Sequence, residues 1–95
     1  MIQHIVLFRV KDGTPRELQQ KACDRLEGLA GKIPGVRSLK AGLDIGVSGN
    51  FDFGLVAELD DQAALDRFST DAGHLDVAYW ILEFREEIAI LDIAR

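Results

Sequence analysis

The chain opens with an alternating stretch, residues 2–10, in which one face is hydrophobic except for a single histidine, His4. The opposite face also carries Ile5 and Leu7, so we expect a strand that is covered on both sides. Residues 87–94, at the other end of the chain, are hydrophobic on both faces in the same way. Both ends of the sequence are therefore predicted to be buried strands.

Two further alternating stretches lie in the middle of the chain, at residues 36–45 and 51–59. The turn-rich segment GVSGN joins them, which is typical of a β-hairpin. The inward positions of the first strand are predicted to be Leu39, Ala41, Leu43 and Ile45. Those of the second are predicted to be Phe51, Phe53, Leu55, Ala57 and Leu59.

Helical spacing replaces alternation between the first two strands. Thr14 is predicted to cap a helix, with Pro15 at the first helical position and Glu17 three residues after the cap. Gly31 is expected to end this helix. Its inward stripe follows steps of three and four residues and comprises Leu18, Ala22, Leu26, Leu29 and Ala30.

The second helical region is predicted to be split in two. Asp60 or Asp61 caps a short helix, and Asp71 caps another that should run from about Ala72 to Glu86. The inward residues of the short helix are predicted to be Ala64, Leu65 and Phe68.

The order βαββαβ predicts one α+β domain over residues 1–95 with a ferredoxin-like fold, a four-stranded antiparallel sheet with helices on one face. In that topology the first and third strands are central. Hydrophobic residues would remain on the helix-free face, namely Ile5, Leu7, Val56, Ala89, Leu91 and Ile93. An exposed patch of this kind predicts a homodimer that pairs through the helix-free sheet face.

Charge and composition limit the classes of partner that the protein is expected to bind. Sixteen acidic residues against eleven Lys and Arg give a net charge of −5, which disfavours binding to nucleic acid and to anionic membranes. The single cysteine, Cys23, cannot form an internal disulfide, and no signal-peptide pattern opens the chain. The longest hydrophobic run, 77–82, is too short to cross a bilayer. We therefore expect a cytoplasmic protein.

Four pieces of sequence together resemble the stress-responsive α/β-barrel (Dabb) family. They are HIVLFRVK at 4–11, KIPGV at 32–36, Gly73-His74 before a hydrophobic helix, and IAILD at 88–92. The resemblance covers essentially the whole chain. It implies a dimeric α/β barrel, in which two copies close their sheets into one barrel.

One branch of that family resembles polyketide cyclases, and it implies an acid–base pair at His74 and His4. The tyrosines of that branch fall on Leu26 and Phe68 here, neither of which can donate a proton. Ala72-Gly73 stands where the branch has a proline before the histidine. The resemblance thus carries over the histidines but not the phenols. Tyr79, five residues beyond His74, is a further phenol that the same helix could supply.

Both histidines are expected to be mostly neutral at pH 7, because burial and the positive end of a helix disfavour a second positive charge. A neutral imidazole can act as a general base, or it can hold a structural hydrogen bond. No metal is expected, since neither H-x-x-x-H nor a Cys/His cluster occurs, and no cofactor is expected. The predicted lining of a pocket between sheet and helices is Val6, Phe8, Leu26, Phe53, Phe68, Val77 and Ala78.

Three functions stay open on this basis. The first is a dimer that binds a small apolar or aromatic molecule. If this dimer is an enzyme, we expect a cofactor-free cyclase or isomerase that uses His74 and His4. The second is a non-catalytic module with structural histidines. The third is a monooxygenase-like enzyme, by analogy of fold. A pocket of roughly 300 Å³ or more beside both histidines would favour ligand binding, and a filled core the structural module.

Overall fold

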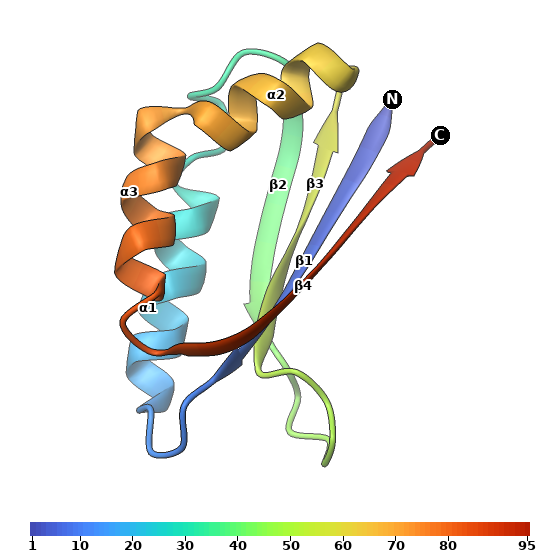
Figure 1. Cartoon of the computed structure of the whole chain (residues 1–95). Coiled ribbons are helices and arrows are strands. Elements are labelled where there is room, and N and C mark those ends of the chain that lie inside the picture. Colours follow the sequence, from blue (N-terminus) through green and yellow to red (C-terminus); the bar gives the residue numbers. More distant parts are fainter.

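A computed structural model describes all 95 residues, and it confirms the predicted βαββαβ order with a divided second helix (Figure 1). The elements are β1 (Ile2–Val10), α1 (Arg16–Glu27), β2 (Val36–Leu43), β3 (Phe53–Leu59), α2 (Gln62–Thr70), α3 (Ala72–Ile81) and β4 (Arg85–Ala94). The fold is ferredoxin-like, as the order of elements predicts.

The four strands form one antiparallel sheet in the order β2-β3-β1-β4, so β1 and β3 are central as predicted. Both chain ends lie side by side, because β1 begins where β4 finishes (Figure 1). The register places His4 of β1 between Ala57 of β3 and Asp92 of β4. A residue near the start of the chain is thereby brought beside one near its end.

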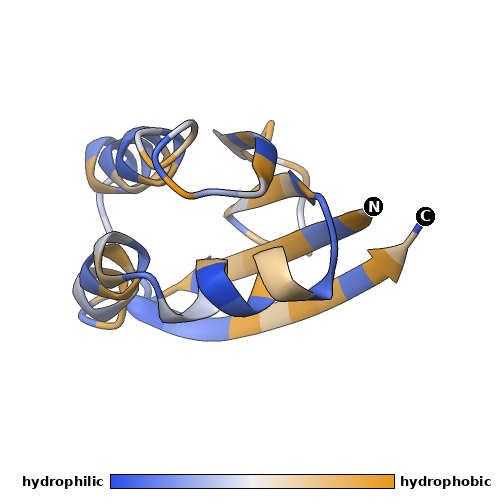
Figure 2. Ribbon diagram, turned by 90° about the horizontal axis from the view of Figure 1, so that it is seen from above, coloured by the Kyte–Doolittle hydropathy of each residue, from blue (hydrophilic) through white to orange (hydrophobic).

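All three helices lie on one side of the sheet (Figure 1). The core fills the space between these helices and the sheet, and His4 is its one buried polar residue. The largest fully buried side chains are those of Phe68, Leu26, Leu59, Ile81 and Cys23. Hydrophobic positions nevertheless continue along β4 up to the C-terminus (Figure 2), and several of them face away from the helices.

Two predicted helix caps are confirmed and one is wrong. Asp61 accepts a hydrogen bond from the backbone N–H of Ala64, and Asp71 accepts one from that of His74. Thr14 does not cap α1, because its hydroxyl donates to the carbonyl of Lys11 in the preceding turn, at 2.6 Å. Pro15 occupies the cap position instead, with extended backbone and no side-chain hydrogen bond.

Both long helices end earlier than predicted. The helix α1 stops at Glu27, because the next two turns are closed by the tighter i to i+3 bonds, Leu29 to Leu26 and Ala30 to Glu27. Ala30, predicted inward, is consequently exposed.

The helix α3 ends at Ile81 and not near Glu86. Similar tight turns follow it, and the backbone carbonyl of Phe84 accepts from Lys11. This bond and the burial of Phe84 turn the chain into β4 from Arg85 onward.

The hairpin between β2 and β3 also corrects one prediction. Ile45 is not inward but 92% exposed, because β2 ends at Leu43 and Asp44 turns the chain. The carboxylate of Asp44 accepts from the backbone N–H groups of Gly46 and Val47 and from the side chain of Asn50. These three bonds lower the pKa of Asp44, with the bond from Asn50 contributing most.

Candidate functional site

A cavity of about 160 Å³ lies between the sheet and α3. Eight of its twelve lining residues are hydrophobic. The lining comprises His4, Val6 and Phe8 of β1, Leu26 of α1, Leu55 of β3, Ser69 of α2, His74, Ala78 and Ile81 of α3, and Arg85, Ile88 and Ile90 of β4. Its four polar members are therefore His4, Ser69, His74 and Arg85.

His4 enters this cavity because strand alternation turns it to the same side as Val6 and Phe8. Its side chain is nearly buried, and its Nδ1 is hydrogen-bonded to the carboxylate of Asp92 on the neighbouring strand. A carboxylate can only accept, so Nδ1 carries the proton. In the neutral ring Nε2 is then a free acceptor, which is the state that a general base requires.

His74 is held at the third position of α3, where its backbone N–H donates to the carboxylate of Asp71 at 3.0 Å. Burial of the ring lowers the pKa of His74. The backbone carbonyl of Ser69 opposes this shift, His4 reinforces it, and Asp71 opposes it more weakly. The imidazole is consequently neutral at pH 7. Its Nδ1 is buried and has no hydrogen-bond partner.

Phe68 of α2 joins the two imidazoles into one cluster. Its ring centroid lies 5.5 Å from that of His4, in an edge contact, and 4.4 Å from that of His74. Phe68 is fully buried, so it fixes both rings by packing. It has no hydroxyl group and supplies no proton to the site.

The other predicted pocket residues divide into two groups. Val6, Phe8, Leu26 and Ala78 line the cavity together with both histidines. Phe68 lies beneath the imidazoles, while Phe53 and Val77 are buried outside the lining, Phe53 stacked on Phe8 at 4.7 Å. Tyr79 is 68% exposed and does not line the cavity either.

Sequence reasoning missed three polar residues of the site, Asp92, Arg85 and Ser69. Asp92 could have been found by pairing the first and last strands end to end, which sets His4 opposite it. Arg85 was missed because the last helix was predicted to extend to about Glu86. In the structure Arg85 belongs to β4, and strand alternation turns its side chain toward the helices. No signal in the sequence singled out Ser69.

No group of three or more His, Cys, Asp or Glu side chains is placed to hold a metal ion. None of the helices is long and hydrophobic enough to span a bilayer.

The only cysteine is buried in α1, where burial and the carboxylates of Asp24 and Glu27 raise the pKa of the Cys23 thiol to about 11. The polar residues that line the cavity are His4, Ser69, His74 and Arg85, and Asp92 is bound to His4.

The model of the stress-responsive A/B barrel domain family, Dabb, matches residues 2–94. The chain belongs to this family. The match spans nearly the whole sequence and confirms the resemblance seen in its four motifs. No curated protein matches the chain.

Several solved structures share the Dabb fold of this chain. A dimeric ferredoxin-like protein of unknown function from Thermobifida fusca is 26% identical, with a TM-score of 0.90 over 99% of this chain and 90% of that one. A dimeric protein of unknown function from Bacteroides fragilis is 23% identical, with a TM-score of 0.84 over 99% and 95%. A hydroxynitrile lyase from Passiflora edulis is 20% identical, with a TM-score of 0.81 over 97% and 90%.

Proposed function

We propose that this Dabb protein is a homodimer that binds one small, largely apolar molecule in the cavity beneath α3. The observation that carries the proposal is the presence of two imidazoles in a cavity with a mostly hydrophobic lining. Ligand sites typically combine an apolar wall with a few convergent polar groups in this way.

The size of the cavity limits the ligand. Its volume of about 160 Å³ does not reach the roughly 300 Å³ that was expected of a ligand site beside both histidines and that is typical of sites for drug-sized molecules. A dry engineered cavity of about 150 Å³ in another protein holds benzene. The cavity therefore suits a single aromatic ring, or an aliphatic molecule of the same bulk, with one polar substituent directed at the histidines.

The helix-free face of the sheet supports the dimer. The register places all six predicted residues there, and Leu7, Val56 and Leu91 are 39%, 40% and 57% exposed. Polar residues surround this centre, among them Gln3, Lys40 and Glu58. A hydrophobic centre with a polar rim is the usual composition of a protein interface.

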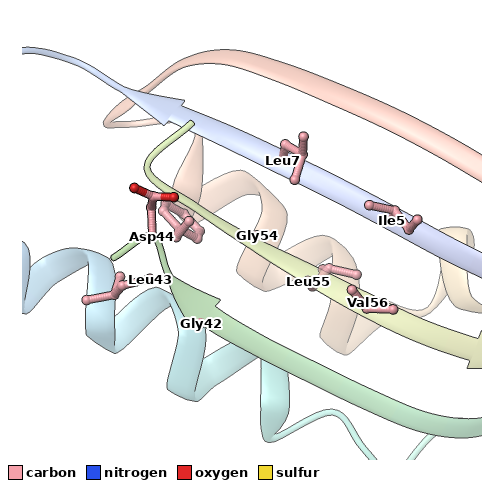
Figure 3. A pocket seen from close by; sticks show the side chains of 9 residues that line it. Ile5, Leu7, Gly42, Leu43, Asp44, Gly54, Leu55 and Val56 are labelled. Atoms are coloured by element: carbon pink, nitrogen blue, oxygen red, sulfur yellow. The ribbon is translucent and has the colours of Figure 1, made fainter. Parts of the chain in front are cut away.

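This face is also hollowed. Figure 3 shows Ile5 and Leu7 of β1 and Val56 of β3 beside Gly42 and Gly54, which are paired across β2 and β3. The hollow measures about 240 Å³. Side chains of a second copy would fill it, and the similar proteins from Thermobifida fusca and Bacteroides fragilis are both dimeric.

A second candidate function is cofactor-free acid–base catalysis, and the bond between His4 and Asp92 favours it. The carboxylate orients the ring and would stabilise an imidazolium formed when Nε2 takes a proton from a substrate. The imidazolium of His4 would then return that proton to the product, while the N–H of neutral His74 would donate a hydrogen bond that polarises a carbonyl oxygen. The hydroxynitrile lyase of Passiflora edulis indicates that an enzyme can be built on this fold, although fold alone assigns no reaction.

Titration with phenol and with toluene tests the binding proposal, because the two molecules differ by one hydroxyl group. Methyl signals of Ala78 and Ile90 should shift with either ligand, and phenol should bind more tightly. His74→Ala should reduce the preference for phenol, while Tyr79→Ala, outside the cavity, should not change it. If neither molecule shifts these signals at millimolar concentration, the cavity is not a ligand site.

Catalysis needs a separate test. Exchange of the α C–H protons of small ketones in deuterated buffer would reveal a general base without requiring the natural substrate. We expect His4→Gln and Asp92→Asn to slow any exchange by about 100-fold, since a positioned base contributes roughly 100-fold to 10,000-fold. Equal rates in the wild type and both variants would remove the acid–base role and leave ligand binding intact.

A further inference from the structure

Arg85 gives the cavity a charge that neither histidine supplies. It lines the cavity from the start of β4, and it is the one Lys or Arg side chain in the lining. Together with Ala78 it also lines a groove on the outer side of α3, beside Leu75, Tyr79 and Leu82. Arg85 therefore lies between the cavity and the groove on the outer side of α3.

Arg85 is also without a partner. Arg9, Arg25 and Arg37 each form an ion pair with a carboxylate. Arg67 and Arg95 donate hydrogen bonds to Pro34 and Gln3.

Arg85 forms neither an ion pair nor a side-chain hydrogen bond, although it is partly buried. Arg16 is the other arginine without a partner, but it is exposed and outside the cavity. The unpaired nitrogen atoms of Arg85 are not among the buried atoms, so its five donors are open to an anion that enters the cavity.

The acidic residues nearby do not fill this role. Glu83 and Glu86 lie within two residues of Arg85 in the sequence, yet neither forms a salt bridge with it. Glu87 is paired with Arg9 on the helix-free face, and Asp92 is bound to His4. The planar, forked guanidinium is thus left available for a group of matching shape, and a carboxylate is that group.

We infer that the ligand is a small carboxylic acid, with its ring or hydrocarbon part among Val6, Leu26 and Ile90 and its carboxylate on Arg85. This inference rests on the proposed ligand site and specifies the class of molecule that it accepts. The carboxylate lies at the mouth of the cavity, where it accepts hydrogen bonds both from the guanidinium group and from water. The opposite end of the molecule lies toward His4 and His74, so a second, uncharged polar substituent of the ligand would be directed at the imidazoles.

Benzoate and benzamide form the matched pair of probes, since they have the same shape and differ in charge. Titration calorimetry at low salt should give benzoate about a tenfold lower dissociation constant, as expected for one charge-assisted bidentate contact. Arg85→Gln should remove the preference and Arg85→Lys should retain part of it. Arg16→Gln removes the same charge outside the cavity and should leave the preference unchanged.

The outcomes separate the two proposals. If both probes bind equally, or if Arg85→Gln keeps the preference for benzoate, the carboxylate inference is overturned while the ligand site stands. If neither probe binds at millimolar concentration, the ligand site itself is overturned and the inference falls with it. Should Arg85→Gln fail to fold, salt provides the second measurement. The preference for benzoate in the wild type must then weaken as ionic strength rises, and a constant preference contradicts the ion pair.

Discussion

At the scale of single residues, His74 couples the stability of the fold to pH. Its folded pKa is lowered by burial, so below about pH 6.5 the unfolded chain binds a proton there that the folded chain does not. The free energy of unfolding should fall with decreasing pH, by at most about 1.4 kcal/mol per pH unit from this group, until the folded ring is protonated too. Denaturant unfolding between pH 5 and 8 measures it.

His74→Gln supplies the comparison, because the amide keeps polar atoms in the same place but does not titrate. The curve of this variant should be flatter than that of the wild type below pH 6.5 and parallel to it above pH 7. Identical slopes at all pH values would show that the ring of His74 is not held neutral by burial.

Cys23 gives a second prediction at this scale. Its side chain is 1% exposed, and with a pKa of about 11 only about a thousandth of the thiol is ionised at pH 8. A thiol reagent should therefore label the folded protein only as fast as the chain opens, and label the denatured protein within seconds. Rapid labelling in native buffer, with the rate proportional to reagent concentration from the start, would contradict this.

At the scale of elements, the paired glycines of the hairpin differ in what surrounds them. A Cβ at Gly54 would lie 2.7 Å from the carbonyl oxygen of Val6 and 3.1 Å from Leu7 Cδ2, whereas a Cβ at Gly42 would meet nothing within 4 Å. Gly54→Ala should destabilise the fold by about 1–3 kcal/mol, since β3 must shift against β1.

Gly42→Ala is the matched control for this prediction. It adds the same methyl group to the partner strand and to the same hollow of the sheet face. Because nothing in the protomer lies within 4 Å of this methyl group, it should change the free energy of unfolding of the protomer by less than about 0.5 kcal/mol. Chemical denaturation of both variants at one protein concentration checks the difference. Equal effects would show that strand propensity, and not the contact with β1, determines the role of Gly54.

The elements also show what local sequence can and cannot predict. Strand alternation places His4 and Val6 on the helix-covered face, because that periodicity is a property of the strand alone. The end of α3 was not predicted because Leu82 to Phe84 include no glycine or proline, which are the local signals of a helix end. Tertiary contacts of Phe84 end the helix instead. The partnership of His4 with Asp92 depends on the register of β1 and β4, which is set by the whole sheet.

At the scale of the whole molecule, the helix-free face and the outer side of α3 are rival surfaces for a partner, since Tyr79 and Leu82 are also exposed. The sheet face is favoured because its hydrophobic residues come from three adjacent strands and are framed by polar ones. We predict a dimer at micromolar concentration that Val56→Glu dissociates. Lys40, directly across from Val56, can pair with the new carboxylate, so the protomer should remain folded.

Tyr79→Glu places the same charge on the opposite side of the protomer and serves as the matched variant. Sedimentation should show a dimer for the wild type and for Tyr79→Glu, and a monomer for Val56→Glu. The dimer dissociation constant should rise by about 100-fold or more in Val56→Glu, because removing a carboxylate from water at the centre of a hydrophobic interface costs several kcal/mol. A monomer for Tyr79→Glu and a dimer for Val56→Glu would instead place the interface at α3, beside the mouth of the cavity. Residues of the partner subunit would then form part of the ligand site.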